Sequence, residues 1–389
     1  MAEAAKRAAT GGLRHEDTSA PADAAPASAP PATTAPAATA PAAPGVRPYV
    51  RASYVVLAIA LPVAAIVALG IGPVAIPAAE VVDVVLAWVG LGGAEVSRAS
   101  QVLVLDVRMP RVLLALVVGS ALAVSGATMQ GIFRNPLADP GLIGVSAGAA
   151  CAAACYIVLA KYFTDSVSEW GLPFAAFVGA LLVTTIVWRV GKQGGQVSIA
   201  TVLLAGIAIN ALTMAGVGVL MLIATDAELR DLTFWNLGSL GGANWTVLGV
   251  AAVVVIPPTL LLPRLAPALN PWLLGDAEVR HLGIDPQRLK RIAFALTALA
   301  VGGAVSMTGV IGFLGLVIPH LVRLLVGPDH RTLMPLSALL GAVLMLVADT
   351  AARTVAAPIE VPIGIMTAFA GAPFFLWLMR RRLHLDGMS

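Results

Sequence analysis

Two arginines and a proline-containing turn bracket one apolar segment of this sequence. Arg108 and Arg111 flank Pro110 at its start, and the run RNPLADP (134–140) follows its end. Guanidinium groups bind carboxylates in a two-pronged geometry, whereas a membrane-spanning helix needs only about 20 apolar residues and neither polar feature. The sequence therefore predicts docking of an acidic partner at the arginines and control of passage at the turn. The alternatives are arginines that reach lipid headgroups and a turn that only connects two helices.

A polar segment later in the chain could contact a partner through short amphipathic helices. It reads LLGDAEVRHLGIDPQRLKR (273–291), and Gly275 and Gly283 divide it into short pieces. Apolar residues such as Leu282 and Ile284 share it with charged residues, and such a helix fits a groove on another protein. The alternative is a helix that lies on the membrane surface.

Two pairs of residues and a single histidine could also carry chemistry. Asp349 and Arg353 are four residues apart, on one face of a helix, and predict a structural ion pair, a docking site, or both. Cys151 and Cys155 also share a face, but a metal site would bring more ligands, so we expect small membrane-buried residues. His320 has no ligand partner nearby in the sequence and is expected to hydrogen-bond within the bundle rather than to ligate haem.

Composition excludes a soluble protein, and motifs exclude a nucleotide-binding one. Of the 389 residues, 59% are hydrophobic and 12% are charged, about half the charged share of a soluble domain. The pair Gly191-Lys192 is followed by Gln193, so it does not form a phosphate-binding loop. No chain of carboxylates runs through the apolar blocks, as an ion-coupled carrier would often need. If ATP drives this protein, the ATPase is another chain.

The apolar residues form long blocks, which predict an all-α, polytopic transmembrane bundle of about ten helices. We expect a disordered Ala/Pro-rich cytoplasmic tail at 1–50, a transmembrane domain at 51–383, and a cytoplasmic loop at 264–290. A surface amphipathic helix is expected at 78–90. The ten expected spans are 52–71, 112–132, 142–162, 172–190, 198–224, 244–263, 291–308, 311–326, 334–355 and 362–379.

The distribution of charge orients these spans. With the N-terminus in the cytoplasm, most of the 24 Lys and Arg fall on the cytoplasmic side, in agreement with the positive-inside rule, and both termini are cytoplasmic. The strings ALAVSGA (121–127) and ALAVGGA (298–304) lie in spans of opposite direction, as in the inverted repeats of transporters. The basic residues left outside are Arg98, Arg108, Arg111, Lys161, Arg230 and Arg353.

Residues 51–382 resemble the FecCD-type permeases of bacterial type II ABC importers, which take up haem, ferric siderophores and cobalamin. Within that family the string MQGIFRNPLADPGLIGVS is most similar to the haem permeases. The matching blocks are RMPR (108–111), SGATMQGIFRNPLADPGLIGVSAGAA (125–150), LLAG (203–206), FWNLGSLGGANW (234–245), LGDAEVRHLGI (274–284), GVIGFLGLVIPHLVR (309–323), LVADTAAR (346–353) and VPIGIMTAFAGAPFFLWLM (361–379).

The resemblance implies a homodimer of ten-helix subunits in the bacterial inner membrane. Its partners would be two ATP-binding subunits, which use ATP and Mg, and a periplasmic substrate-binding protein. This chain would then have no catalytic residue, bound cofactor or metal, and no nucleic-acid partner. Haem is the expected cargo, a ferric siderophore or cobalamin is the alternative, and an ATPase-independent carrier or receptor is the rival of another class.

The resemblance also assigns residues to three sites. Docking of the binding protein falls to Arg108, Arg111 and Arg353. The cytoplasmic gate falls to Asn135, Pro136 and Leu137. Contact with the ATPase falls to Gly275, Asp276, Ala277, Glu278, Leu282 and Gly283.

Overall fold

A computed structural model describes residues 48–92, 96–162 and 169–386 of the chain. The tail expected at 1–50 lies outside these residues except for its last three, which already belong to the first helix. The side chains of Asp276, Ala277 and Glu278 are also outside the description. Residues 46–389 form one compact unit, and all that follows concerns this unit.

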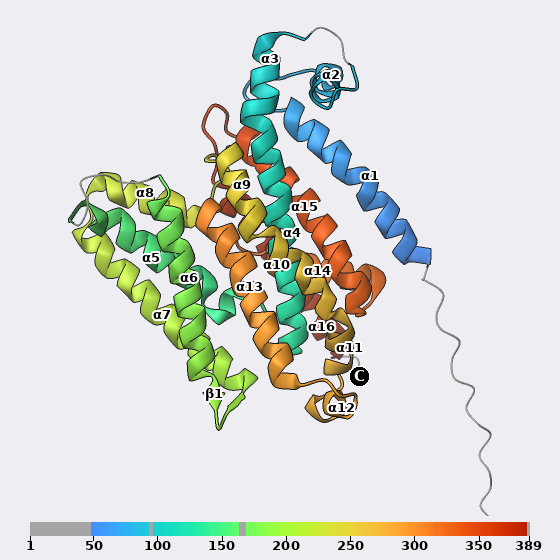
Figure 1. Cartoon of the computed structure of the whole chain (residues 1–389), viewed down its shortest axis with the longest axis vertical. Helices are drawn as coiled ribbons and strands as arrows, with labels where there is room; N and C mark the ends of the chain where they lie inside the picture. The colour runs from blue at the N-terminus through green and yellow to red at the C-terminus, as the bar shows by residue number, and fades with distance from the viewer. Residues whose placement is uncertain (1–47, 93–95, 163–168, 387–389) are drawn as a thin grey trace, which may run out of the picture. The chain divides into compact units, whose positions relative to one another are not determined.

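The described residues are helical apart from turns and one short hairpin (Figure 1). The first half contains α1 (Pro48–Gly70), α2 (Ala78–Trp88), α3 (Arg98–Val102), a π-helical turn (Leu103–Arg108), α4 (Met109–Phe133), α5 (Val145–Leu159), α6 (Gly171–Val190), β1 (Lys192–Gln193), β2 (Gln196–Val197) and α7 (Ile199–Ile223). The second half contains α8 (Asp226–Leu237), α9 (Trp245–Val254), α10 (Ile256–Leu261), α11 (Ala266–Trp272), α12 (Asp276–His281), α13 (Pro286–Thr308), α14 (Leu314–Val326), α15 (His330–Thr354) and α16 (Ile363–Asp386).

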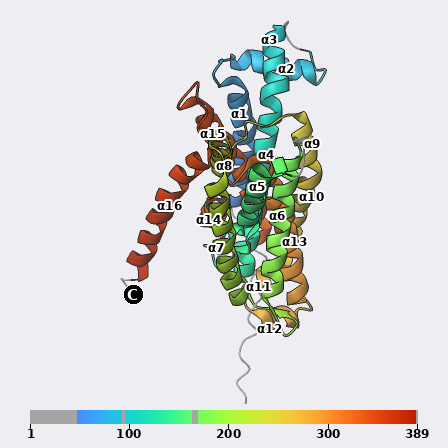
Figure 2. The same cartoon turned by 90° about the vertical axis from the view of Figure 1, so that its left-hand side faces the viewer.

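The all-α membrane bundle predicted from composition is confirmed. In the described part of the chain, 8 helical segments are long and apolar enough to cross a membrane, and shorter apolar helices occur at Leu314–Val326 and Ile363–Leu376. Together they correspond to the ten expected spans. The surface helix expected at 78–90 is α2, which runs crosswise to α1 and α4 (Figure 2).

Two expected boundaries were wrong, and proline explains both. The second span does not begin at 112, because one helical segment runs from Arg98 to Phe133. Pro110 has no N–H to donate to the preceding turn, and the π-helical turn before it accommodates that loss, with the Met109 N–H bonding to the Val104 carbonyl.

The sixth span likewise continues beyond 263, to Trp272. Its pieces α10 and α11, and the 3-10 turn between them, each have proline in their first turn, where a missing N–H costs nothing. The chain therefore bends without leaving the helix. The cytoplasmic loop expected at 264–290 is accordingly helical through its first part.

Helix α4 lies at the centre of the bundle, against α13, α14 and α15 (Figure 1). In the most apolar 18-residue stretch of the segment that contains α4, 78% is buried inside the protein, whereas the corresponding share is only 11% for α1 and for α7. Close approach depends on glycine: a Cβ on Gly126 would lie 1.9 Å from the Gly315 carbonyl oxygen, and one on Gly119 would lie 2.3 Å from that of Gly341. A side chain at either glycine would collide with the neighbouring helix, and small residues of this kind let membrane helices pack closely.

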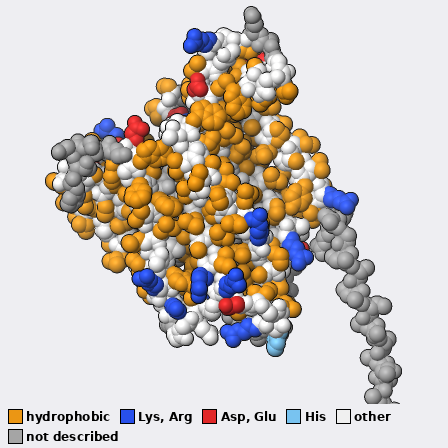
Figure 3. All heavy atoms as spheres, viewed as in Figure 1, with side chains coloured by type: hydrophobic (Ala, Val, Ile, Leu, Met, Phe, Trp, Pro, Cys, Tyr) orange, Lys and Arg blue, Asp and Glu red, His pale blue; other side chains and the backbone are white. Residues whose placement is uncertain are grey.

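The surface separates apolar from charged side chains along the bundle axis. Figure 3 shows hydrophobic side chains over the middle of one face, and Lys and Arg gathered toward the end that carries α12 and β1. We refer to that end as the inner end and to the end that carries α2 and α3 as the outer end.

Candidate functional site

Two of the three predicted docking arginines are held inside the protein at the outer end. The Arg108 guanidinium donates to the carbonyls of Leu69, Gly70 and Val74, and Arg353 donates to those of Ala68 and Ile71. These acceptors lie at or just beyond the C-terminus of α1, where carbonyls have no helical partner and the helix dipole favours a cation.

Only 4% of the surface of Arg108 and of Arg353 is exposed. Both side chains therefore fix the outer end of α1 against α4 and α15. The sequence predicted that these two residues lie on the same side of the membrane, and the structure places them at the same end of the bundle, but the sequence did not predict that backbone carbonyls would occupy them.

Arg111 differs from the other two because its acceptors among the described residues are carboxylate oxygens rather than backbone carbonyls. Its Nε and one terminal nitrogen lie 3.0 and 2.9 Å from Oδ1 of Asp349, and its two terminal nitrogens lie 2.9 and 3.0 Å from the two oxygens of Glu360. Arg353 forms an ion pair with the other Asp349 oxygen at 3.0 Å. The ion pair expected between Asp349 and Arg353 is confirmed. The Asp349 side chain is completely buried and pairs with both Arg111 and Arg353.

We call Arg108, Arg111, Arg353, Asp349 and Glu360 the outer cluster. Glu360 had not been predicted, because it lies in the loop between α15 and α16, where sequence spacing gives no geometric relation to Arg111. The sequence did contain one signal that could have pointed to Glu360: it is a carboxylate in a loop at the outer end of a protein that has few charged residues. Docking itself is not tested by these contacts and stays a prediction.

At the inner end, α4 finishes in the turn predicted to form the gate. Arg134 adopts the left-handed conformation (φ 50°, ψ 31°) and ends the helix. The Asn135 side chain then accepts the Leu137 N–H at 2.9 Å, and the Ala138 N–H bonds the Asn135 carbonyl. Leu137 is 38% exposed, so its apolar side chain lies at the surface of this end, and its role in a gate stays a prediction.

The next residues anchor the turn to helices on either side of it. Asp139 accepts the Gly141 N–H at 2.7 Å and so begins the 3-10 turn Pro140–Ile143. Burial raises the pKa of the Asp139 carboxyl, and the Gly141 N–H partly opposes this rise. Asn210 of α7 donates to the Gly141 carbonyl at 3.1 Å, so a hydrogen bond connects α7 to the residues that follow the predicted gate turn.

Trp272, at the end of α11, joins the gate turn to the predicted ATPase-contact segment. It is fully buried, its indole N–H donates to the Ile132 carbonyl at 3.0 Å, and its own carbonyl accepts from Arg134 Nε at 2.7 Å. The Arg134 guanidinium and the Lys290 ammonium lie 4.3 and 5.0 Å from the ring centroid, within the range of cation–π attraction. Sequence reasoning missed Trp272, although a lone tryptophan beside a polar loop was visible.

Lys290 extends this junction to the start of α7. Its ammonium donates to the Val197 carbonyl at 3.0 Å, and the Val197 N–H bonds the Gln287 side chain at 2.8 Å. The hairpin β1–β2 is therefore held on the first turn of α13.

The predicted ATPase-contact residues lie in a separate short helix at the inner end, or directly beside it. Gly275 and Gly283, with φ of +126° and +75°, bound α12 in conformations that favour glycine. Leu282 is 62% exposed. Asp276, Ala277 and Glu278 lie on α12, but their side chains are outside the described residues. The division into short helical pieces predicted from the two glycines is confirmed.

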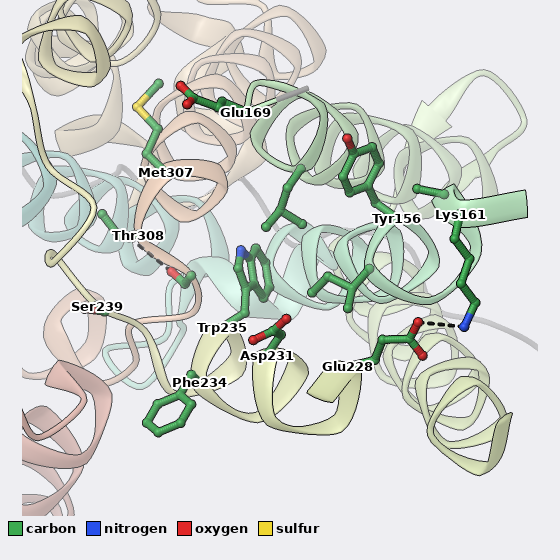
Figure 4. Close-up of a pocket in the computed structure, with 14 residues that line it drawn as sticks. Tyr156, Lys161, Glu169, Glu228, Asp231, Phe234, Trp235, Ser239, Met307 and Thr308 are labelled. Atoms are coloured by element: carbon green, nitrogen blue, oxygen red, sulfur yellow. Dashed lines mark hydrogen bonds and ion pairs between the residues drawn. The ribbon is translucent and has the colours of Figure 1, made fainter. Parts of the chain in front are cut away.

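A pocket of about 580 Å³ opens between α5, α8 and the end of α13 (Figure 4). Tyr156 and Trp235 contribute aromatic surface, and Glu228 is paired with Lys161 at 2.7 Å. This pairing lowers the pKa of Glu228, so its carboxylate stays charged. With Asp231 and Glu169 also on the lining, the pocket repels anions, and we assign it no cargo.

The chain is similar to known membrane permeases. The model of the FecCD transport family matches residues 60–381. The hemin transport system permease HmuU of Yersinia pestis is 48% identical over 278 residues, which cover 72% of this chain and 83% of that protein. The cobalamin import system permease BtuC of Halobacterium salinarum is 42% identical over 287 residues, which cover 74% and 76%.

A solved structure agrees as well. A metal-chelate type ABC transporter in an inward-facing conformation superposes with a TM-score of 0.73 at 32% identity, over 85% of this chain and 99% of that one.

Proposed function

The chain belongs to the FecCD transport family, and from that premise we propose that it is the permease of an ATP-driven importer whose cargo is haem. The observation that supports this cargo is the 48% identity with a hemin permease across most of both chains. The ATPase-independent carrier or receptor considered from the sequence is not favoured by family membership.

We place the permease in the bacterial inner membrane as a homodimer, with a periplasmic binding protein at the outer end and two ATP-binding subunits at the inner end. Apolar side chains on α7, including Leu204, Leu212 and Leu222, are 69 to 85% exposed, which leaves this helix free to face lipid or a second copy. The basic inner end supports a cytoplasmic orientation of both termini.

The permease works without covalent chemistry. ATP-driven movement of the partner ATPases reaches α12, passes through Trp272 to Arg134, and repositions the gate residues Asn135, Pro136 and Leu137. Docking at the outer end biases the same two-state bundle from the other side, so that a gate opens only when loaded binding protein and ATP are both present.

Reconstitution tests the cargo directly. Proteoliposomes that contain the permease and its ATPase should take up haem from the binding protein when ATP is inside, and omission of the ATPase should abolish uptake. Cobalamin is the second candidate because of the 42% identity with a cobalamin permease, and a ferric siderophore is the third. Faster uptake of either one than of haem would overturn the haem assignment but keep the importer.

A further inference from the structure

Each arginine of the outer cluster is already bound to groups of this chain among the described residues. Arg108 and Arg353 are bonded to the end of α1, and Arg111 is bonded to Asp349 and Glu360. An acidic group that docks here must replace one of the groups already bound. The question is which of them can leave.

Burial answers this question. The Asp349 side chain is 0% exposed and contacts two arginines, whereas the Glu360 side chain is 41% exposed and contacts one. Removing a buried carboxylate from its cations leaves uncompensated charge, but an exposed pair is weak because water screens it. Glu360 is therefore the exchangeable member of the outer cluster.

The position of Glu360 gives such an exchange a structural consequence. It lies in the loop 355–362 that joins α15 to α16. Beside it, the Val361 N–H bonds the Ala352 carbonyl at 2.9 Å, and the Ile363 N–H bonds the Gly238 carbonyl at 3.0 Å. The pair with Arg111 is the side-chain tie that adds to these two backbone bonds, and release of Glu360 leaves the loop held by its backbone alone. Figure 2 shows α16 leaning away from the rest of the bundle below this loop.

We propose that Glu360 occupies Arg111 as an internal stand-in for a carboxylate of the binding protein, and that docking exchanges one for the other and releases the loop 355–362. This inference rests on the proposed function. In the undocked state the three arginines and two carboxylates leave one net positive charge in the outer cluster. Release of Glu360 exposes Arg111 to the partner.

The exchange predicts that a change on this chain tightens docking. An exposed ion pair contributes about 0.2–1 kcal/mol, so the docking-competent state is the minor one, and removal of the competitor raises apparent affinity by about two- to sixfold. A purely structural role for Glu360 predicts the opposite, because loss of the pair would loosen the docking surface.

The experiment uses the full-length permease with its ATPase in nanodiscs and measures the affinity of the binding protein. We expect Glu360→Gln to bind two- to sixfold more tightly than wild type, and Glu360→Asp to stay near wild type. Glu228→Gln removes one negative charge at the same end and keeps its capping role, so it controls for a general charge effect. Hydrogen exchange of residues 355–362 should rise on docking and be raised already in Glu360→Gln.

The outcomes separate the two levels of the argument. If Arg111→Gln weakens docking while Glu360→Gln binds no more tightly than wild type or Glu228→Gln, docking stands and the stand-in is refuted. If Glu360→Gln binds tightly but exchange in 355–362 is unchanged, release of the loop is refuted. If the binding protein does not bind the wild-type complex at all, the proposed function fails and this inference falls with it.

Discussion

The contact of Trp272 with the gate turn gives the sharpest prediction for coupling. Trp272→Phe keeps a buried aromatic ring but removes the indole N–H that bonds the Ile132 carbonyl at 3.0 Å. A hydrogen bond of this kind contributes about 1 kcal/mol. Phenylalanine also attracts cations less strongly than tryptophan, which weakens the contacts with Arg134 and Lys290 by about 0.5 kcal/mol together.

The total, about 1.5 kcal/mol, is about tenfold in an equilibrium constant. The ATPase-contact segment would then move more often without the gate turn. We expect haem transported per ATP hydrolysed to fall by up to about tenfold while ATP hydrolysis itself continues. The ratio is measured in proteoliposomes from radiolabelled or absorbing haem and released phosphate.

A matched substitution controls for the change of side chain. Trp245 of α9 donates its indole N–H to the Leu105 carbonyl at 3.1 Å at the outer end of the bundle, so Trp245→Phe removes the same kind of bond away from α12 and should leave the ratio near wild type. An unchanged ratio in Trp272→Phe, or an equal loss in both variants, would refute the link. Arg134→Gln in the Trp272→Phe background should add less than it does alone, because both changes break one junction.

Three further predictions follow from burial and charge. Asp349→Asn should lower the free energy of unfolding by about 3 kcal/mol because it removes a buried carboxylate from two arginines and leaves the buried Arg353 without an anionic partner. Glu360→Gln should lower it by under about 1 kcal/mol; equal losses in thermal unfolding in detergent would contradict this difference. Because burial raises the pKa of Asp139, the folded wild type loses stability as pH rises through that pKa, so Asp139→Asn should gain relative stability with rising pH; parallel unfolding profiles against pH would disprove it. Replacement of Asp276 and Glu278 by alanine should uncouple ATP hydrolysis from uptake, and intact coupling would remove α12 from ATPase contact.

The sequence predicted the membrane bundle because spanning is a local property. Each apolar block satisfies its own backbone hydrogen bonds as a helix, so composition and block length suffice to find it. The polar interruptions were equally local: the turn after Phe133, the glycines around α12 and the pair Asp349–Arg353 were all predicted from neighbouring residues. The predicted boundaries at 112 and 263 were wrong, and the helical segments extend to Arg98 and to Trp272. Proline in the first turn of a helical piece permits a bend as well as an end.

What the sequence by itself determined was therefore which segments cross the membrane and which end of the bundle holds each polar motif. The tertiary structure alone decided which distant residues those motifs contact. Arg111 meets Glu360 across 249 positions of the chain, and the Trp272 indole meets the Ile132 carbonyl across 140. Such contacts depend on how helices pack against one another, through close approaches such as Gly126 on Gly315, and the spacing of residues along one segment carries no record of them. For that reason the arginines were predicted as docking groups, and only their tertiary contacts show that they are bound within the chain, with Glu360 as the exposed carboxylate among their partners.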